Sequence, residues 1–161
     1  MNHKNRGMIL ETIINNTIDF YNRNGVAIFH KKNLDISFKK IGKDLSVKKG
    51  MVLKKSTVDY YGIYNGIFVA FEAKSTNENL LNIKQIPDHQ IQYLEQIRKH
   101  KGCAFFIIFF KQYEQFFILD ISKFDKTEKS ISVDFLKKNG IEVILTYPGI
   151  IDFVEHIGSM V

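Results

Sequence analysis

The dipeptide Asn65-Gly66 lies between two runs of alternating residues, and it constrains the fold more than any other feature of the chain. Asn-Gly is the preferred pair for a two-residue type I′ turn, because the twist of that turn matches the twist of antiparallel strands. The sequence therefore predicts a hairpin with strands at 58–64 and 67–73. A two-residue loop also fixes the register, since it pairs the residues on either side of the turn.

The predicted register brings four polar residues together on one face of the hairpin. Counting outward from the turn places Asp59 across from Glu72, and Thr57 across from Lys74. Opposed residues have Cβ atoms about 4.5–5.5 Å apart, and residues two apart along a strand share a face. A β-bulge near Gly62 would shift the register by one residue and separate them.

Two opposed carboxylates need a compensating group, because they repel by roughly 4 kcal/mol at about 4 Å and an effective dielectric constant near 20. A lysine, a shared proton or a divalent cation would relieve this repulsion. Mg²⁺ prefers oxygen ligands, so Asp59 and Glu72 are candidate ligands and Thr57 could add a third oxygen. Lys74 would then orient or deprotonate an attacking water, or neutralise charge on a phosphate. The alternative is a solvated salt-bridge cluster, since an E-x-K string alone is common.

Two further polar residues are candidates for the same site. Gln90 falls within the apolar stripe of a predicted helix, beside Leu94 and Ile97, so its amide needs an interior partner. The alternative is an amide in the first helical turn that reaches water or caps the helix. Glu11 flanks the apolar stripe of the first predicted helix, where it either points to the site or is solvated.

The remaining pattern predicts one domain over residues 1–161, in which helices pack on a central mixed β-sheet of an α/β fold. Helical spacing of apolar residues and short apolar runs define the elements. The predicted helices are 8–23, 87–101 and 149–156, the further strands are 26–30, 104–110, 115–121 and 141–145, and a loop is predicted at 77–86.

A lysine-rich stretch at 31–55 predicts a projecting hairpin or arm, since it is too apolar for a disordered linker and too charged for a core strand. Its lysines should bind phosphates without selecting a sequence, and this binding should weaken with salt. The lysines expected to contact DNA are Lys39, Lys40, Lys43, Lys48, Lys49, Lys54 and Lys55. The net charge of +6 also favours a polyanionic partner, with nucleic acid ahead of an anionic membrane. The alternative is a basic protein without such a partner.

Three features of the sequence bear on the cellular location: its cysteine content, its first residues and the length of its apolar runs. The single cysteine, Cys103, excludes a disulfide or a zinc cluster within one chain. The first residues contain no long apolar segment typical of a signal peptide. The longest apolar run, 103–110, is too short to span a bilayer. We therefore expect a cytoplasmic protein with no membrane partner.

Five stretches of the chain resemble the RecU family of Holliday junction resolvases, which are members of the PD-(D/E)xK nuclease superfamily. They are NRGMILE, STVDYYGIYNG, FVAFEAKST, DHQIQYLEQI and YPGIIDFVEHI. They occur in the family's order, with compatible gaps, and are spread over most of the chain, from residue 5 to residue 157. The resemblance implies a restriction-endonuclease-like core with a projecting stalk, which corresponds to residues 31–55.

The resemblance also implies a function: a homodimeric, Mg²⁺-dependent endonuclease, with Mn²⁺ as a substitute, that makes paired symmetrical nicks in four-way DNA junctions during recombination and repair. The implied metal ligands are Thr57, Asp59, Glu72 and Gln90. Lys74 is then the catalytic lysine, and Glu11 is an acidic residue that supports the site. Further implied partners are a branch-migration helicase and a recombinase, which places the protein at the nucleoid.

The chain departs from the family in its N-terminal tail, which is shorter than is common, although Arg6 remains as an expected DNA contact. Two alternatives stay open. A nuclease with the same fold could act on another DNA substrate. A non-catalytic DNA-binding module could use the Asp59, Glu72 and Lys74 cluster as a structural ion network.

Overall fold

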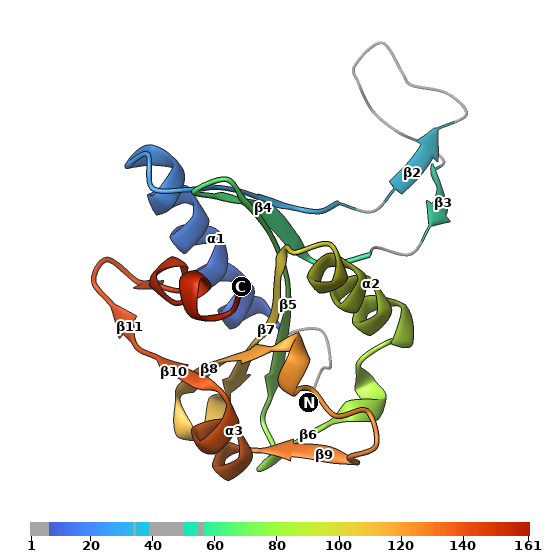
Figure 1. The fold of residues 1–161 in the computed structure, drawn as a ribbon, viewed down its shortest axis with the longest axis vertical. Coiled ribbons are helices and arrows are strands. Elements are labelled where there is room, and N and C mark those ends of the chain that lie inside the picture. The colour runs from blue at the N-terminus through green and yellow to red at the C-terminus, as the bar shows by residue number, and fades with distance from the viewer. Residues whose placement is uncertain (1–6, 34, 39–49, 55–56) are drawn as a thin grey trace.

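A six-stranded mixed sheet forms the centre of the protein (Figure 1). The computed structural model describes residues 7–33, 35–38, 50–54 and 57–161, with side chains described in 7–33 and 57–161. The strand order is β1-β4-β5-β7-β8-β10, with β5 and β7 parallel and the other neighbours antiparallel. The strands are β1 (Ile28–Lys31), β4 (Tyr60–Tyr64), β5 (Ile67–Thr76), β7 (Cys103–Phe110), β8 (Gln115–Asp120) and β10 (Ile141–Val143).

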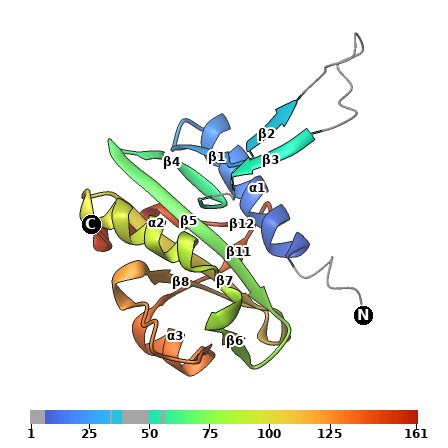
Figure 2. The same cartoon turned by 90° about the vertical axis from the view of Figure 1, so that its right-hand side faces the viewer.

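Helices cover both faces of this sheet, as Figures 1 and 2 show. Helix α1 (Met8–Arg23) packs on one face, and α2 (Asp88–Lys99) and α3 (Val133–Asn139) pack on the other. Each face has its own buried apolar cluster, one around Phe71 and Phe105 and one around Phe106. This arrangement confirms the predicted mixed α/β fold with helices flanking the sheet. No helix in the described ranges is both long and apolar enough to span a bilayer.

The position of strand β7 in the sheet explains its unusually apolar sequence, CAFFIIFF. All eight residues are buried, because the strand lies between β5 and β8 and both of its faces are covered by helices. Alternate side chains therefore point into opposite clusters, Phe105 toward α1 and Phe106 toward α2. The thiol of Cys103 belongs to this core, and burial raises its pKa to about 12, so it is unsuited to be a nucleophile.

The predicted hairpin of β4 and β5 is confirmed in its turn and its register. Asn65 and Gly66 both have positive φ, 47° and 81°, as a type I′ turn requires. The pairs run without a shift from Tyr64 and Ile67 at the turn to Tyr60 and Phe71. No bulge interrupts the described pairs at Gly62, and β5 continues beyond them to Thr76.

Gly62 instead allows close approach of the edge strand β1. A Cβ at this position would overlap the Ile28 carbonyl oxygen and the Phe29 ring, and it would lie 2.8 Å from Phe29 Cα. Two of these atoms are backbone, so β1 would have to move. We expect Gly62→Ala to destabilise the protein by about 3 kcal/mol, measured by urea unfolding. Gly158→Ala is the control, because a Cβ there meets nothing within 4 Å, and equal losses would contradict the explanation.

A second hairpin, β2 (Asp35–Phe38) with β3 (Gly50–Lys54), projects from the body of the protein (Figure 1). Both strands lie within the stretch 31–55, for which the sequence predicts a projecting hairpin or arm. The predicted DNA contacts lie outside the residues whose side chains the structure describes; they are Arg6, Lys39, Lys40, Lys43, Lys48, Lys49, Lys54 and Lys55.

The region after β5 contains more regular structure than predicted. The expected loop 77–86 holds β6 (Leu80–Asn82) and a 3₁₀ helix at Ile83–Gln85. Strand β6 pairs with β9 (Ser130–Ser132), which precedes α3. Strands of three residues carry too few alternating positions to be recognised from their sequence.

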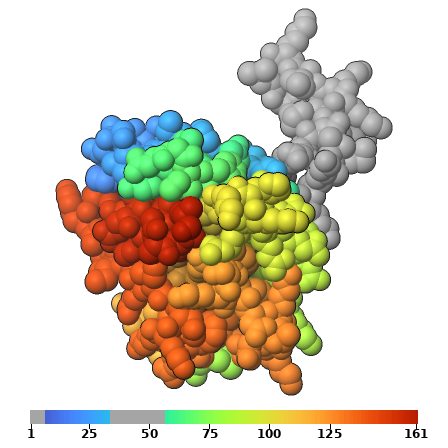
Figure 3. Space-filling view, in the orientation of Figure 1, coloured from blue at the N-terminus to red at the C-terminus, as the bar shows by residue number. Residues whose placement is uncertain are grey.

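The C-terminal prediction is wrong, because 149–156 is not an α-helix. Its residues form β12 (Ile150–Ile151), which pairs with β11 (Leu145–Thr146), and then a 3₁₀ helix at Val154–Ser159. The backbone here bonds to α1: Ile151 N donates to Thr17 Oγ1 at 3.1 Å, and Phe153 N donates to the Tyr21 hydroxyl at 2.9 Å. The same segment lies against α2 on the face seen in Figure 3, where Arg98 donates to the Met160 carbonyl at 2.8 Å.

Candidate active site

Glu72 lies in the middle of β5, fully buried beneath α2. Its position follows from strand alternation: Phe71 faces the α1 cluster and Ala70 the α2 cluster, so Glu72 and Lys74 face α2. Neither carboxylate oxygen of Glu72 has a hydrogen-bond partner. A buried carboxylate whose oxygens accept no hydrogen bond is costly to folding, so this residue is a candidate for function.

Asp59 is held beside Glu72, one step beyond the last pair of β4 and β5, as the register predicts. Two bonds fix it. Asp59 Oδ2 accepts a hydrogen bond from Ala73 N at 3.2 Å, and the Asp59 carbonyl accepts one from Lys32 N at 2.7 Å. The first of these bonds ties the carboxylate to β5 next to Glu72, so the two acids share one location.

Burial and the neighbouring Asp59 carboxyl both influence the ionisation of Glu72. Burial raises the pKa of Glu72 far above its usual range, and the Asp59 carboxyl raises it further, while Lys74 opposes the rise. Without an added cation, this environment therefore disfavours the ionised form of Glu72. Burial and the second carboxyl destabilise the ionised form of Glu72, and a bound cation would stabilise it.

Lys74 is the cation of the site, and Gln90 orients it. Lys74 Nζ lies 2.9 Å from Gln90 Oε1, to which it donates, and 3.9 Å from Glu72 Oε2. Gln90 is buried in the first turns of α2, so the expected interior partner of its amide is Lys74. The amide oxygen that would bind a metal thus already has a lysine partner, although a carbonyl oxygen has a second lone pair.

Thr57 and Glu11 are less directly placed than the other candidates. Strand β4 begins at Tyr60, so the predicted pairing of Thr57 with Lys74 lies beyond the paired strands. Thr57 Oγ1 instead accepts a hydrogen bond from Lys32 Nζ at 3.0 Å. Glu11 is exposed on α1 and forms an ion pair with Lys31. It lies close enough to Tyr60 to help raise the pKa of that phenol.

Lys32 is a residue that the sequence analysis missed as part of the site. The sequence marks it only as one lysine of the stretch 31–55, yet it contacts the segment that carries Thr57 and Asp59. The one feature that could have pointed to Lys32 is its position directly after β1, which is a short edge strand. The sequence alone does not say that β1 pairs with β4 and so brings Lys32 to this position.

The oxygen groups of the site fit a hard divalent ion. The described residues contain no group of three or more His, Cys, Asp or Glu that could hold a metal, which excludes a site built wholly from such side chains there. Mg²⁺ needs fewer protein ligands than such a site provides, since it is usually bound by one or two carboxylates together with waters and substrate phosphates. Asp59 and the two orphaned oxygens of Glu72 meet that need, with Thr57 and Gln90 as further oxygen donors.

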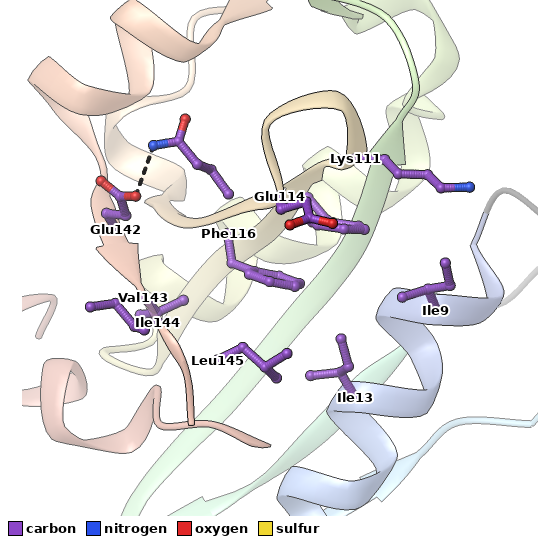
Figure 4. Close-up of a pocket in the computed structure, with 11 residues that line it drawn as sticks. Ile9, Ile13, Lys111, Glu114, Phe116, Glu142, Val143, Ile144 and Leu145 are labelled. Carbon is purple, nitrogen blue, oxygen red and sulfur yellow. Dashed lines mark hydrogen bonds between the residues drawn. The ribbon is translucent and has the colours of Figure 1, made fainter. Parts of the chain in front are cut away.

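A separate groove of about 440 Å³ opens between α1 and the strands β8 and β10 (Figure 4). Ile9 and Ile13 of α1 face Phe116 and Leu145 across it, and its polar rim includes Glu142, which accepts a 2.9 Å hydrogen bond from Gln115. Of the predicted site residues whose side chains the structure describes, none lines this groove. The carboxylate pair under α2 is therefore the better candidate for chemistry.

Comparison with known proteins gives consistent matches along the chain. The family model described as "RecU: Recombination protein U" matches residues 5–159. Proteins named Holliday junction resolvase RecU are 45% identical in Mycoplasmopsis pulmonis, over 98% of this chain and 97% of theirs, and 41% identical in Ureaplasma parvum, over 99% and 96%. The Staphylococcus aureus protein of the same name is 31% identical over 97% of this chain and 81% of its own.

Solved structures that match the chain include that of Archaeoglobus fulgidus Hjc, a Holliday junction resolvase from an archaeal hyperthermophile. It has a TM-score of 0.48 and 12% sequence identity, and the match covers 77% of this chain and 90% of that one.

Proposed function

The chain belongs to the RecU family, and we propose that it is a divalent-metal-dependent endonuclease that resolves Holliday junctions. One observation of the structure carries this proposal: Glu72 is buried with both oxygens unpartnered, beside Asp59 and next to a lysine. Relatives that match almost the whole chain are named Holliday junction resolvases. The arrangement of the site thus supports metal-dependent hydrolysis, and the names of the relatives support a Holliday junction as the substrate.

The proposed cofactor is Mg²⁺, with Mn²⁺ as a substitute, held by Asp59 and Glu72 with Thr57 and Gln90 as further ligands. When bound, such an ion supplies positive charge that polarises a phosphodiester and lowers the pKa of water. Asp59 and Glu72 are suited to hold it, because the Ala73 N–H fixes the first and the strand fixes the second. Such a cation would favour the ionised form of Glu72 over the protonated one.

Lys74 provides the charge that the reaction itself needs. Its ammonium is held by Gln90 rather than left to rotate in solvent, so it can donate to the attacking water or to a phosphate oxygen as negative charge develops. In-line attack leaves a 5′-phosphate and a 3′-hydroxyl. In this proposal Glu11 supports the site through its effect on Lys31 and Tyr60, rather than by touching the substrate.

Junction selectivity is proposed to come from shape. A single nuclease domain over 1–161 would form a homodimer, whose two sites make paired symmetrical nicks. The arm at 31–55 would enter the open centre of the junction, and its lysines would bind phosphates. A protein with this role acts on DNA in the cytoplasm, at the nucleoid, alongside a branch-migration helicase and a recombinase.

Metal removal tests the proposal. We expect a labelled four-way junction to be nicked symmetrically in Mg²⁺, to remain intact in EDTA, and to be nicked again when Mg²⁺ or Mn²⁺ is restored. A linear duplex of the same sequence is the control, and we expect it to be cut far more slowly. The measurement is a denaturing gel of all four labelled strands.

Other results would favour the alternatives. Equal cutting of junction and duplex would indicate a nuclease of the same fold with another DNA substrate. A junction that is bound but never cut, by wild type and by Asp59→Ala alike, would indicate a DNA-binding module. Cutting in EDTA would exclude the proposed metal dependence.

A further inference from the structure

We propose that Lys32 is a positioning residue that holds the segment carrying Thr57 and Asp59 in place at the metal site. The proposal rests on the proposed function and deepens it, since it assigns a role to a residue outside the carboxylate cluster. Lys32 lies at the end of the edge strand β1 and is half-buried.

The segment 57–59 needs such support because it is not part of the sheet. Strand β4 begins at Tyr60, which pairs with Phe71 on one side and with Lys31 on the other. The paired strands begin only at Tyr60, and before it Val58 is buried in the apolar cluster under α2. Yet Asp59 must keep its carboxylate next to Glu72, so contacts outside the ladder have to position it.

Lys32 supplies two of these contacts from one residue. Its backbone N–H donates to the Asp59 carbonyl at 2.7 Å, which continues the β1 and β4 pairing one step beyond the strands. Its Nζ donates to Thr57 Oγ1 at 3.0 Å. The two bonds therefore hold the segment at both ends, while the Ala73 N–H holds the Asp59 carboxylate from β5.

The side-chain bond also aims the Thr57 hydroxyl. A hydroxyl oxygen has two lone pairs, and the Lys32 ammonium takes one of them, which fixes the direction of the other. Groups that orient metal ligands in this way typically contribute about 10–100-fold to metal affinity or activity. Lys32 and Thr57 also belong to the two chain segments that flank 34–56, so their bond joins the base of the arm to the active site.

The test is a titration of the metal-free protein with Mn²⁺ alone, without DNA, by isothermal calorimetry. Lys32→Met removes the ammonium and keeps an apolar stem of similar length. We expect it to weaken Mn²⁺ binding by about tenfold and to leave the thermal midpoint of the metal-free protein nearly unchanged. Lys32→Arg should restore most of the affinity. The control is Lys137→Met, which removes the same charge from the exposed end of α3.

A double-mutant cycle separates this role from a general effect of charge. If Lys32 acts through the Thr57 hydroxyl, Lys32→Met should cause little further loss in a Thr57→Val background. Unchanged Mn²⁺ affinity in Lys32→Met, or an equal loss in both backgrounds, would overturn the proposal while the proposed function stands. A wild-type protein that binds no Mn²⁺ would overturn both.

Discussion

Replacing Glu72 by glutamine is expected to lower the rate of junction cleavage by about 10³-fold or more and to abolish tight Mn²⁺ binding. Glutamine keeps the shape of the side chain and one carbonyl oxygen, but it cannot carry the negative charge that the site offers to a cation. Several kcal/mol of charge stabilisation disappear with it, and each 1.36 kcal/mol corresponds to about tenfold in rate. Single-turnover cleavage and Mn²⁺ calorimetry measure the two effects.

The same substitution is expected to stabilise the metal-free protein. Glu72 loses its proton near pH 4.3 in an unfolded chain, but burial and Asp59 raise its pKa in the folded protein. Between these two pKa values the folded chain holds a proton that the unfolded chain has lost, so stability falls as pH rises. A glutamine side chain does not titrate. The melting temperature of Glu72→Gln should therefore exceed that of wild type by more at about pH 8 than at about pH 5.

Glu78→Gln is the matched control for both measurements, because Glu78 is exposed in the segment that follows the same strand. It should leave cleavage, Mn²⁺ binding and melting near wild type. Cleavage retained by Glu72→Gln would contradict the assigned site. Loss of cleavage together with a lower melting temperature would indicate that Glu72 is a structural residue. It would also show that the buried Glu72 side chain does not destabilise the folded protein.

The positions of the two carboxylates of the candidate site could be predicted from the sequence because the geometry that sets them is local. A two-residue turn at Asn65-Gly66 sets the register of every pair in the hairpin, and strand alternation then decides which residues face α2. The positions of Asp59 and Glu72 follow from these two facts alone. The buried amide of Gln90 could be predicted too, since its place on the helical stripe required an interior partner.

The C-terminal segment could not be predicted in the same way, because distant residues determine it. Its apolar residues have a spacing that suits a helix, but Thr17 of α1 binds the backbone of Ile151 in strand β12, and Tyr21 binds that of Phe153, where the 3₁₀ helix begins. The Tyr21 hydroxyl also donates to Asp152 at 2.7 Å. These bonds join residues more than 100 positions apart, and no local pattern encodes them. Lys32 was missed for a related reason, since its contacts depend on the pairing of β1 with β4.

The second large effect is expected at Lys74, and it should separate catalysis from metal binding. Lys74→Met removes the ammonium that Gln90 holds 3.9 Å from Glu72. We expect the cleavage rate at saturating Mg²⁺ to fall by about 10²–10³-fold, as when one donor to a developing charge is lost. Mn²⁺ affinity should change little or increase, because a positive charge beside the two carboxylates is removed. The same calorimetry and single-turnover assays measure both.

This separation distinguishes the catalytic role of Lys74 from a merely neutralising one. If Lys74 only balanced the charge of Asp59 and Glu72, a bound divalent ion would replace it, and Lys74→Met would cut junctions normally at high Mg²⁺. If Lys74 stabilises charge that develops on the phosphate or orients the attacking water, no concentration of Mg²⁺ restores the rate. Lys137→Met is again the control for loss of one positive charge. A rate that recovers with Mg²⁺ would therefore assign Lys74 to the electrostatic balance of the site and leave the orientation of the attacking water to another group.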